Sequence, residues 1–246
     1  MKKIRVTRSI IPNLLTLGNI FSGFTAIIFI SNYDFTNATL YIFMAAIFDM
    51  LDGIVARLLN ATSEIGAELD SLCDAVSFGV APAFMIYKAF FFQYGNLGIL
   101  LASLPALAGV LRLARFNVQL VTFEDKLFFK GMPIPAAALT IVSFVIFYLQ
   151  KNILDKLTLE IIAFVIIVLV PLAMTSTFKF YNLPRPNKET LKQRPALFIF
   201  LIVAIILVII TKGYAIFPVM IFYLLASPAH EIICTLKKIR EKNEKN

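Results

Sequence analysis

The chain alternates between long apolar runs and short polar or basic segments. A membrane-spanning helix needs about 20 mostly apolar residues, and runs of about that length fall near residues 11–31, 37–58, 67–92, 96–116, 133–150, 157–178, 195–211 and 214–234. The fifth and seventh runs are the shortest, so the sequence predicts either seven or eight spanning helices. The pattern predicts an all-α, polytopic transmembrane helix bundle. We expect one integral-membrane domain over residues 1–246, with a motif-bearing core at 10–178 and additional C-terminal helices at 195–234.

Composition favours the same class of protein. Of the 246 residues, 59% are hydrophobic and 15% are charged, and the mean hydropathy is +0.84; a soluble domain is about 45–50% apolar and about 25% charged. The two cysteines, Cys73 and Cys234, match no metal or disulfide spacing. The net charge of +8 does not indicate a nucleic-acid partner, because no soluble basic domain exists to hold one. Basic loops instead favour contact with anionic lipid headgroups.

Lysine and arginine positions predict the orientation in the membrane. If the N-terminus is cytoplasmic, most of these residues fall on cytoplasmic segments, and the other side keeps Lys88, Lys151, Lys156 and Lys212. Since positive residues collect on the cytoplasmic side, we expect both termini in the cytoplasm. The expected location is the cell (inner) membrane, crossed several times.

Four aspartates interrupt the second and third apolar runs. Asp49 and Asp52 are spaced i, i+3, and Asp70 and Asp74 are spaced i, i+4, so each pair shares one face of its helix. Carboxylates within a membrane segment are costly and normally face a cavity, a partner or an ion. Two such faces turned together would form a four-carboxylate cage at the cytoplasmic ends of these helices. Its hard oxygen ligands suit Mg²⁺ or Mn²⁺.

The residues between the aspartates suit a phosphate ligand. Gly53 and Ala56 are small enough to let a bulky, flat ligand approach, and Arg57 can bind a phosphate bidentately. Ser63 is expected to cap the third helix after the turn at 60–63, and an exposed helix start is an anion site. Together they indicate a diphosphate held by divalent ions, of which two could clamp the attacked phosphorus and the leaving oxygen. A carboxylate at the cage edge could take the proton of an attacking hydroxyl.

The pattern D-x-x-D-G-x-x-A-R-x₈-G-x-x-x-D-x-x-x-D is met at every fixed position from Asp49 to Asp74. Here the chain resembles the CDP-alcohol phosphatidyltransferase family. The resemblance implies a phospholipid-synthesis transferase that moves a phosphatidyl group from a CDP-alcohol lipid to a hydroxyl and releases CMP. It implies that the four aspartates hold the metals, that Asp74 is also the base, and that a homodimer is common. It implies CDP-lipid contacts from Asn13, Leu14, Leu15, Thr16, Gly53, Ala56, Arg57, Ser63 and Gly66.

Three further segments, at residues 12–23, 112–117 and 129–137, resemble the phosphatidylserine synthase branch of that family. This resemblance implies CDP-diacylglycerol as the donor and L-serine as the acceptor. Arg112 or Arg115 near the cavity would then pair with the serine carboxylate, which glycerol phosphate and inositol phosphate lack.

Several alternatives stay open at this point. A synthase of the same family could use glycerol 3-phosphate or inositol phosphate, and an ion-coupled transporter could use membrane aspartates as a relay. Arginines also collect at cytoplasmic helix ends, so Arg112 and Arg115 need no substrate, and Asn13 and Thr16 could simply cap the first helix. Direct displacement is favoured over a covalent intermediate because no nucleophile stands out in the motif.

Overall fold

The structure is a computed structural model that describes residues 10–61, 63–120, 128–181 and 195–243. Its α-helices are α1 (Ile10–Ser31), α2 (Phe35–Leu58), α3 (Glu64–Asp74), α4 (Ala81–Ala89), α5 (Gly95–Leu120), α6 (Ile134–Phe144), α7 (Lys156–Thr175), α9 (Pro195–Ile210) and α10 (Ile216–Asn243). Two π-helical turns, η1 (Ala75–Val80) and η3 (Val145–Leu149), and a 3₁₀ turn, η2 (Phe91–Tyr94), connect or extend them. The two short strands are β1 (Phe128–Lys130) and β2 (Lys179–Tyr181).

The described helices confirm the predicted all-α, multi-pass membrane architecture. Five of them are long and apolar enough to cross a membrane: Ile10–Ser31, Phe35–Leu58, Glu64–Ala89, Phe91–Val118 and Lys156–Thr175. Shorter apolar helices cover Ile134–Leu149, Phe200–Ile210 and Ile216–Ala229. Each predicted run therefore contains an apolar helical segment. Ten of the 23 lysines and arginines that predict the orientation lie outside the described residues, at 1–9, 121–127, 182–194 and 244–246.

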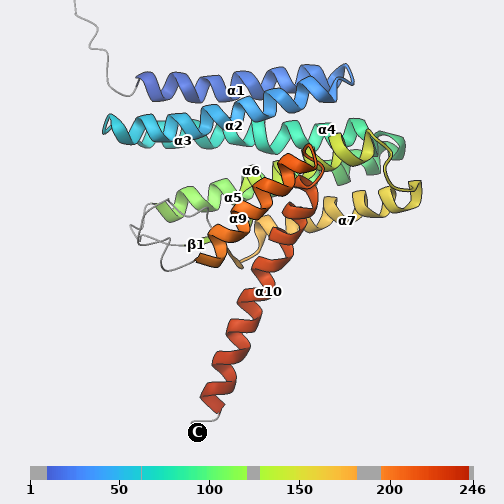
Figure 1. Cartoon of the computed structure of the whole chain (residues 1–246). Helices are drawn as coiled ribbons and strands as arrows, with labels where there is room; N and C mark the ends of the chain where they lie inside the picture. Colours follow the sequence, from blue (N-terminus) through green and yellow to red (C-terminus); the bar gives the residue numbers. More distant parts are fainter. Residues whose placement is uncertain (1–9, 62, 121–127, 182–194, 244–246) are drawn as a thin grey trace, which may run out of the picture.

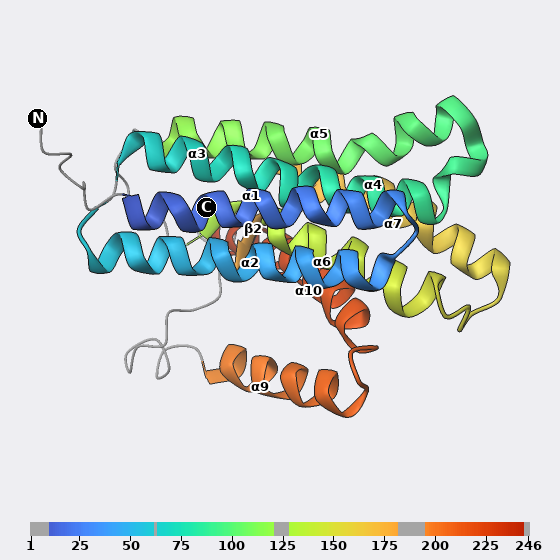
Figure 2. The ribbon, with the colours of Figure 1, turned by 90° about the horizontal axis from the view of Figure 1, so that it is seen from above.

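The first three spans form the part of the bundle that carries the aspartates. α1 and α2 form a hairpin whose turn is closed by Asp34, which caps α2 by accepting a hydrogen bond from the Asn37 amide. Figures 1 and 2 show α3 and α4 running alongside this hairpin, with α5 beyond them. Small buried residues on α1 and α2, such as Ala26, Ala38 and Ala45, let the helices approach closely, as is usual where packing replaces the hydrophobic effect in lipid.

The third span is one helix with an irregular turn in it. α3, η1 and α4 follow one another without a break from Glu64 to Ala89, and the π-helical turn begins directly after Asp74. Such turns add one residue to a helical turn and often mark functional positions. The irregularity therefore lies at the last of the four aspartates.

A small antiparallel ribbon, which the sequence did not predict, joins the segment before α6 to the segment after α7. β1 pairs with β2 in the register Phe129↔Phe180. Beside it, the Gly131 amide donates to the Phe178 carbonyl at 2.9 Å. Gly131 has φ of +82°, and a Cβ there would collide with the Met174 carbonyl, so this position requires glycine. Strand pairing thus precedes Ile134, where the helix α6 begins.

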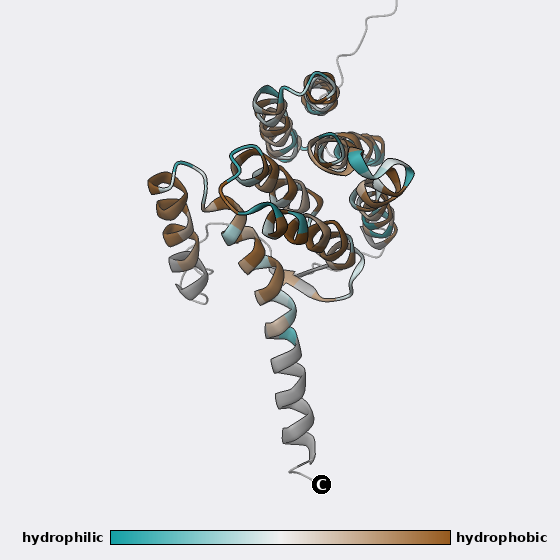
Figure 3. Ribbon diagram, turned by 90° about the vertical axis from the view of Figure 1, so that its right-hand side faces the viewer, coloured by the Kyte–Doolittle hydropathy of each residue, from teal (hydrophilic) through white to brown (hydrophobic). Residues whose placement is uncertain are grey.

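The C-terminal helices are attached to the outside of this core. α9 lies beside the bundle and meets it through α10, and the second half of α10 extends away from the other helices (Figures 1 and 2). Figure 3 shows mainly hydrophobic residues along the helices that it colours and hydrophilic ones mainly in the turns. This distribution is the one expected for a protein surrounded by lipid.

Candidate active site

Three carboxylates converge between α2 and α3. One oxygen from each of Asp49, Asp70 and Asp74 lies within 4.8 Å of the others, and Asp74 is buried. At 1.5 Å per residue, the aspartates lie roughly 9 to 15 Å from the end of the bundle where α2 ends and α3 begins. Carboxylates this close repel one another, and the repulsion is weakly screened away from water. The group therefore needs positive charge from another source.

Asp52 stands next to this group and is held from α1. It is close enough to act electrostatically on Asp49 and Asp70. Its Oδ2 accepts a hydrogen bond of 2.7 Å from the Thr16 hydroxyl, and both side chains are buried. The structure thus brings all four predicted aspartates to one region, three in a tight group and the fourth fixed by Thr16.

Asn19, one helical turn after Thr16, makes the corresponding contact to Asp74. Its Nδ2 donates to Asp74 Oδ1 at 3.0 Å, and its side chain is fully buried. Asn19 was not among the predicted site residues. The available signal was a polar residue three positions from Thr16 on an apolar helix, which places both on one helix face.

The donor set fits a divalent cation. Asp70 Oδ1 is buried and accepts no hydrogen bond from any residue that the structure describes. A buried, unpaired carboxylate oxygen is costly, and here it belongs to a group with two other carboxylates. Oxygen-only ligands of this kind match Mg²⁺ or Mn²⁺ better than the nitrogen and sulfur ligands that zinc prefers. The cluster can therefore hold a metal ion.

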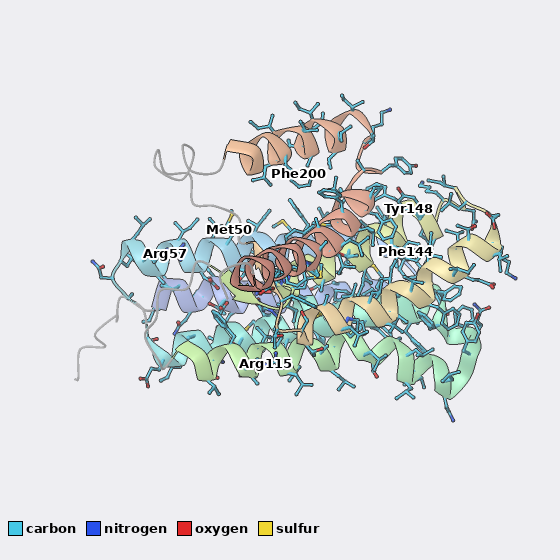
Figure 4. The ribbon with its side chains drawn as sticks, turned by 90° about the horizontal axis from the view of Figure 1, so that it is seen from below. Met50, Arg57, Arg115, Phe144, Tyr148 and Phe200 are labelled. Carbon is cyan, nitrogen blue, oxygen red and sulfur yellow. The ribbon has the colours of Figure 1, made fainter. Side chains whose placement is uncertain are left out.

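Gly53 directly follows Asp52, and the Arg57 side chain, one turn further on, lies over it. A Cβ on Gly53 would lie 3.7 Å from Nη1 of Arg57, an ordinary contact distance, and would meet nothing closer. Packing against the described residues therefore does not require glycine there, in contrast to Gly131. Figure 4 shows Arg57, whose side chain is exposed, near the end of α2.

The start of α3 meets the start of α1. Ser63 caps α3 as predicted, with its hydroxyl accepting a hydrogen bond of 3.0 Å from the Gly66 amide. A Cβ on Gly66 would lie 3.0 Å from Ser63 Oγ and 3.6 Å from Asn13 Oδ1. Asn13, Ser63 and Gly66 are thus neighbours at the end of the bundle nearest the aspartates. This end presents a helix N-terminus, which suits an anion.

The remaining residues predicted to contact the lipid differ in how far they are buried. Asn13 and Thr16 lie inside α1, which begins at Ile10, so they do not cap it. Leu14 is 61% exposed on the outer surface of α1, whereas Leu15 and Ala56 are half-buried. Leu14 therefore faces away from the carboxylates.

The two predicted acceptor arginines have different surroundings. Arg112 is buried on α5 and interacts electrostatically with Asp74 and with Tyr223 of α10. Arg115 is exposed, and its Nη1 donates to the Thr175 carbonyl at 2.9 Å, which joins α5 to the end of α7 (Figure 4). Only Arg112 of the two is brought toward the aspartates by the contacts of the described residues.

Comparison with known proteins places the chain in a family. The sequence pattern of the CDP-alcohol phosphatidyltransferases matches residues 9–175, a range that holds all four aspartates and both arginines. The chain belongs to the CDP-alcohol phosphatidyltransferase family.

Relatives with curated names resemble the chain over about half of its length or over nearly all of it. A CDP-diacylglycerol–serine O-phosphatidyltransferase of Helicobacter pylori is 36% identical over 95% of each chain. The protein of the same name from Bacillus subtilis is 41% identical over 54% of this chain and 73% of its own. An archaetidylserine synthase of Methanothermobacter thermautotrophicus is 42% identical over 54% of this chain and 57% of its own.

Proposed function

We propose that this family member is a phosphatidylserine synthase, which transfers the phosphatidyl group of CDP-diacylglycerol to the hydroxyl of L-serine and releases CMP. The observation that carries the proposal is the convergence of Asp49, Asp70 and Asp74, with Asp52 held next to them by Thr16. Full-length similarity to a protein named for this reaction supports the acceptor. Serine is also the acceptor named in the archaeal relative, whose lipid is different.

The reaction is a displacement at phosphorus. The serine hydroxyl oxygen forms a bond to the phosphorus that carries diacylglycerol, and the bond from that phosphorus to the bridging oxygen of the diphosphate breaks. CMP leaves with the bridging oxygen. The hydroxyl proton goes to the Asp74 carboxylate, which acts as general base. Mg²⁺ or Mn²⁺, two ions in this proposal, would supply Lewis-acid stabilisation of the diphosphate charge when bound.

The chain's own residues position the donor lipid. Asp49, Asp52, Asp70 and Asp74 hold the metal ions in this proposal. Arg57 and the α3 start at Ser63 and Gly66 bind diphosphate oxygens, while Gly53 and Ala56 leave room for the nucleotide. Asn13 lies beside Gly66 and contributes a polar contact from α1.

Arg112 is the residue we assign to the serine carboxylate. It is buried within electrostatic reach of the proposed base, so a carboxylate bound to it would hold the serine hydroxyl on the side of Asp74. Arg115 is occupied by the Thr175 carbonyl and has a structural role in this proposal. An Arg112→Lys variant should raise the KM for serine more than the KM for CDP-diacylglycerol, and equal changes in both would argue against the assignment.

An acceptor panel tests the proposed function. Purified protein receives CDP-diacylglycerol and Mg²⁺ or Mn²⁺ with serine, glycerol 3-phosphate, inositol or inositol phosphate, and CMP release is followed. CMP that appears with serine alone is the expected result. CMP with another acceptor assigns the protein to a different activity of the family, and no CMP with any of them overturns the proposal. Removal of the divalent ion with EDTA should stop CMP release with serine.

We further propose a single domain with its catalytic core at residues 10–178, in an inner membrane, with the active site and both termini on the cytoplasmic side. Contacts of the basic segments with anionic lipid headgroups and a homodimer are part of the same proposal.

Labelling with a membrane-impermeant thiol reagent tests the orientation. A single cysteine introduced at Asn152 should react from the outside in intact cells, and one introduced at Asn60 should not.

A further inference from the structure

α1 supplies one hydrogen-bond donor to each of two aspartates on two different helices. The Thr16 hydroxyl donates to Asp52 on α2 at 2.7 Å, and the Asn19 amide donates to Asp74 on α3 at 3.0 Å. All four side chains are buried. The two donors are spaced i, i+3, so one face of α1 reaches both partners at once. α1 contributes no carboxylate to this group, yet it contacts its members on both neighbouring helices.

The position of α1 against α3 and η1 is fixed one turn further along. Ser77, in the π-helical turn, donates its hydroxyl to the Asn19 backbone carbonyl at 3.1 Å. Opposite Ser77 stands Gly23, where any Cβ would collide with the Ser77 side chain and backbone. Gly23 thus lets the two helices touch, and Ser77 holds the carbonyl of the residue whose side chain binds Asp74. The position of the Asn19 side-chain amide is therefore fixed by two contacts of α1, the hydrogen bond from Ser77 to the Asn19 carbonyl and the close packing of Gly23 against Ser77.

We propose that Asn19 and Thr16 are positioning residues, which set the rotamers of Asp74 and Asp52 so that their remaining oxygens face the metal ions and the acceptor hydroxyl. The inference rests on the proposed function for the role of Asp74 as base. A hydrogen bond to one oxygen of a carboxylate leaves the other oxygen free and stops the group from rotating. Groups that orient metal-binding carboxylates in this way typically account for about 10- to 100-fold in metal affinity or activity.

Mutual repulsion makes this restraint necessary. Asp74 lies in a tight group with Asp49 and Asp70, and without an external donor its carboxylate would turn away from them in the free enzyme. Asn19 is neutral, so it holds Asp74 without cancelling the negative charge that binds a cation. A lysine or arginine in its place would hold the carboxylate but would compete with the metal.

Asn19→Leu tests the proposal with a side chain of similar size and no donor. We expect kcat for CMP release to fall about 10- to 100-fold, with the KM for CDP-diacylglycerol changed less than about 3-fold. Binding of Mn²⁺ alone, followed by electron paramagnetic resonance without substrates, should weaken by a similar factor. Ser22→Ala is the matched control, because Ser22 is also buried on α1 but donates only to the Gly18 carbonyl of its own helix; it should change neither quantity.

Thr16 provides a second pair of variants in case Asn19→Leu does not fold. Thr16→Val keeps the shape and removes the hydroxyl, whereas Thr16→Ser keeps the hydroxyl. Loss of Mn²⁺ affinity in the valine variant and its recovery in the serine variant are expected. The proposal is overturned if folded Asn19→Leu binds Mn²⁺ and turns over within 2-fold of the wild type, or if Thr16→Ser loses as much as Thr16→Val. If the wild type releases no CMP with any acceptor, the proposed function fails, and Mn²⁺ binding alone decides on the positioning residues.

Discussion

The two ends of the bundle are built on opposite principles. At the end where α2 meets α3, four aspartates, Thr16 and Asn19 are brought inside the protein. At the end where α4 turns into α5, the interior is aromatic: the Phe91 ring packs edge-on against Phe90 and Phe164, with centroids 5.0 and 5.3 Å apart. The first end gathers like charges, and the second gathers apolar surface.

The difference separates the parts of the protein that act from those that stabilise it. Converging carboxylates oppose folding unless cations or donors compensate, whereas packed aromatic rings favour it. We therefore expect substitutions at the aspartate end to change activity while the fold survives, and substitutions at the aromatic end to do the reverse. The predictions that follow test this division from its largest expected effect to its smallest.

The largest effect is expected for Asp74→Asn. The amide has the size of the carboxylate but can neither accept a proton nor contribute full charge, so kcat for CMP release from serine should fall by about 10² to 10⁴. Thermal unfolding without divalent ions should occur at an unchanged or higher temperature, because one repelling charge has gone. Activity within 10-fold of the wild type would remove Asp74 from the proposed mechanism.

At the aromatic end, Phe91→Ala should act on stability. Phe91 is fully buried, and truncation of such a phenylalanine costs about 3 to 5 kcal/mol. Thermal or denaturant unfolding in detergent should detect this loss, while the KM for CDP-diacylglycerol of the folded fraction stays unchanged. Phe92→Ala is the matched control, since its side chain is 53% exposed and should lose little. Equal losses in the two variants would contradict the role given to the aromatic cluster.

The sequence predicted these two ends unequally. Spacing alone brings Asp49 with Asp52, and Asp70 with Asp74, onto common helix faces, so the acidic group was foreseeable from the helical period. The Asn19 contact was not, because helix–helix register depends on where Gly23 meets Ser77, and no local pattern specifies that. The π-helical turn after Asp74 arises from tertiary packing, and the β1–β2 ribbon from pairing over only three residues. A short apolar segment of the sequence gives no distinct signal for either feature. Aromatic residues were visible in the composition, but the packing of Phe90, Phe91 and Phe164 against one another was not.

The start of α3 gives a smaller effect that joins stability and function. Ser63→Ala removes the hydroxyl that accepts from the Gly66 amide, and loss of such a cap costs about 1 kcal/mol. Because this helix start also belongs to the proposed diphosphate site, the KM for CDP-diacylglycerol should rise several-fold. Ser63→Thr retains the cap and should recover both the unfolding temperature and the KM. A rise in KM that persists in Ser63→Thr would show that the cap is not its cause.

The smallest effect is expected from the cap at the other end, Asp155, which accepts hydrogen bonds from the Thr158 hydroxyl and amide at 2.7 and 2.9 Å. These bonds, the one from the hydroxyl first, hold the pKa of the exposed Asp155 carboxyl below its ordinary value.

A carboxyl with a lower pKa in the folded state stabilises the protein above its unfolded-state pKa, and this contribution disappears as the pH falls through the folded-state pKa. Asp155→Ala should therefore lower the unfolding temperature slightly at pH 7. The difference in unfolding temperature from the wild type should narrow as the pH falls below the ordinary pKa of an aspartate and the folded-state carboxyl takes up its proton. Asp155→Asn retains an acceptor without a titrating charge, so its unfolding temperature should stay closer to that of the wild type at pH 7. The kcat of both folded variants should equal that of the wild type, because this cap, unlike Ser63, lies at the end of the bundle away from the group of four aspartates. A change in kcat would contradict the division between the two ends.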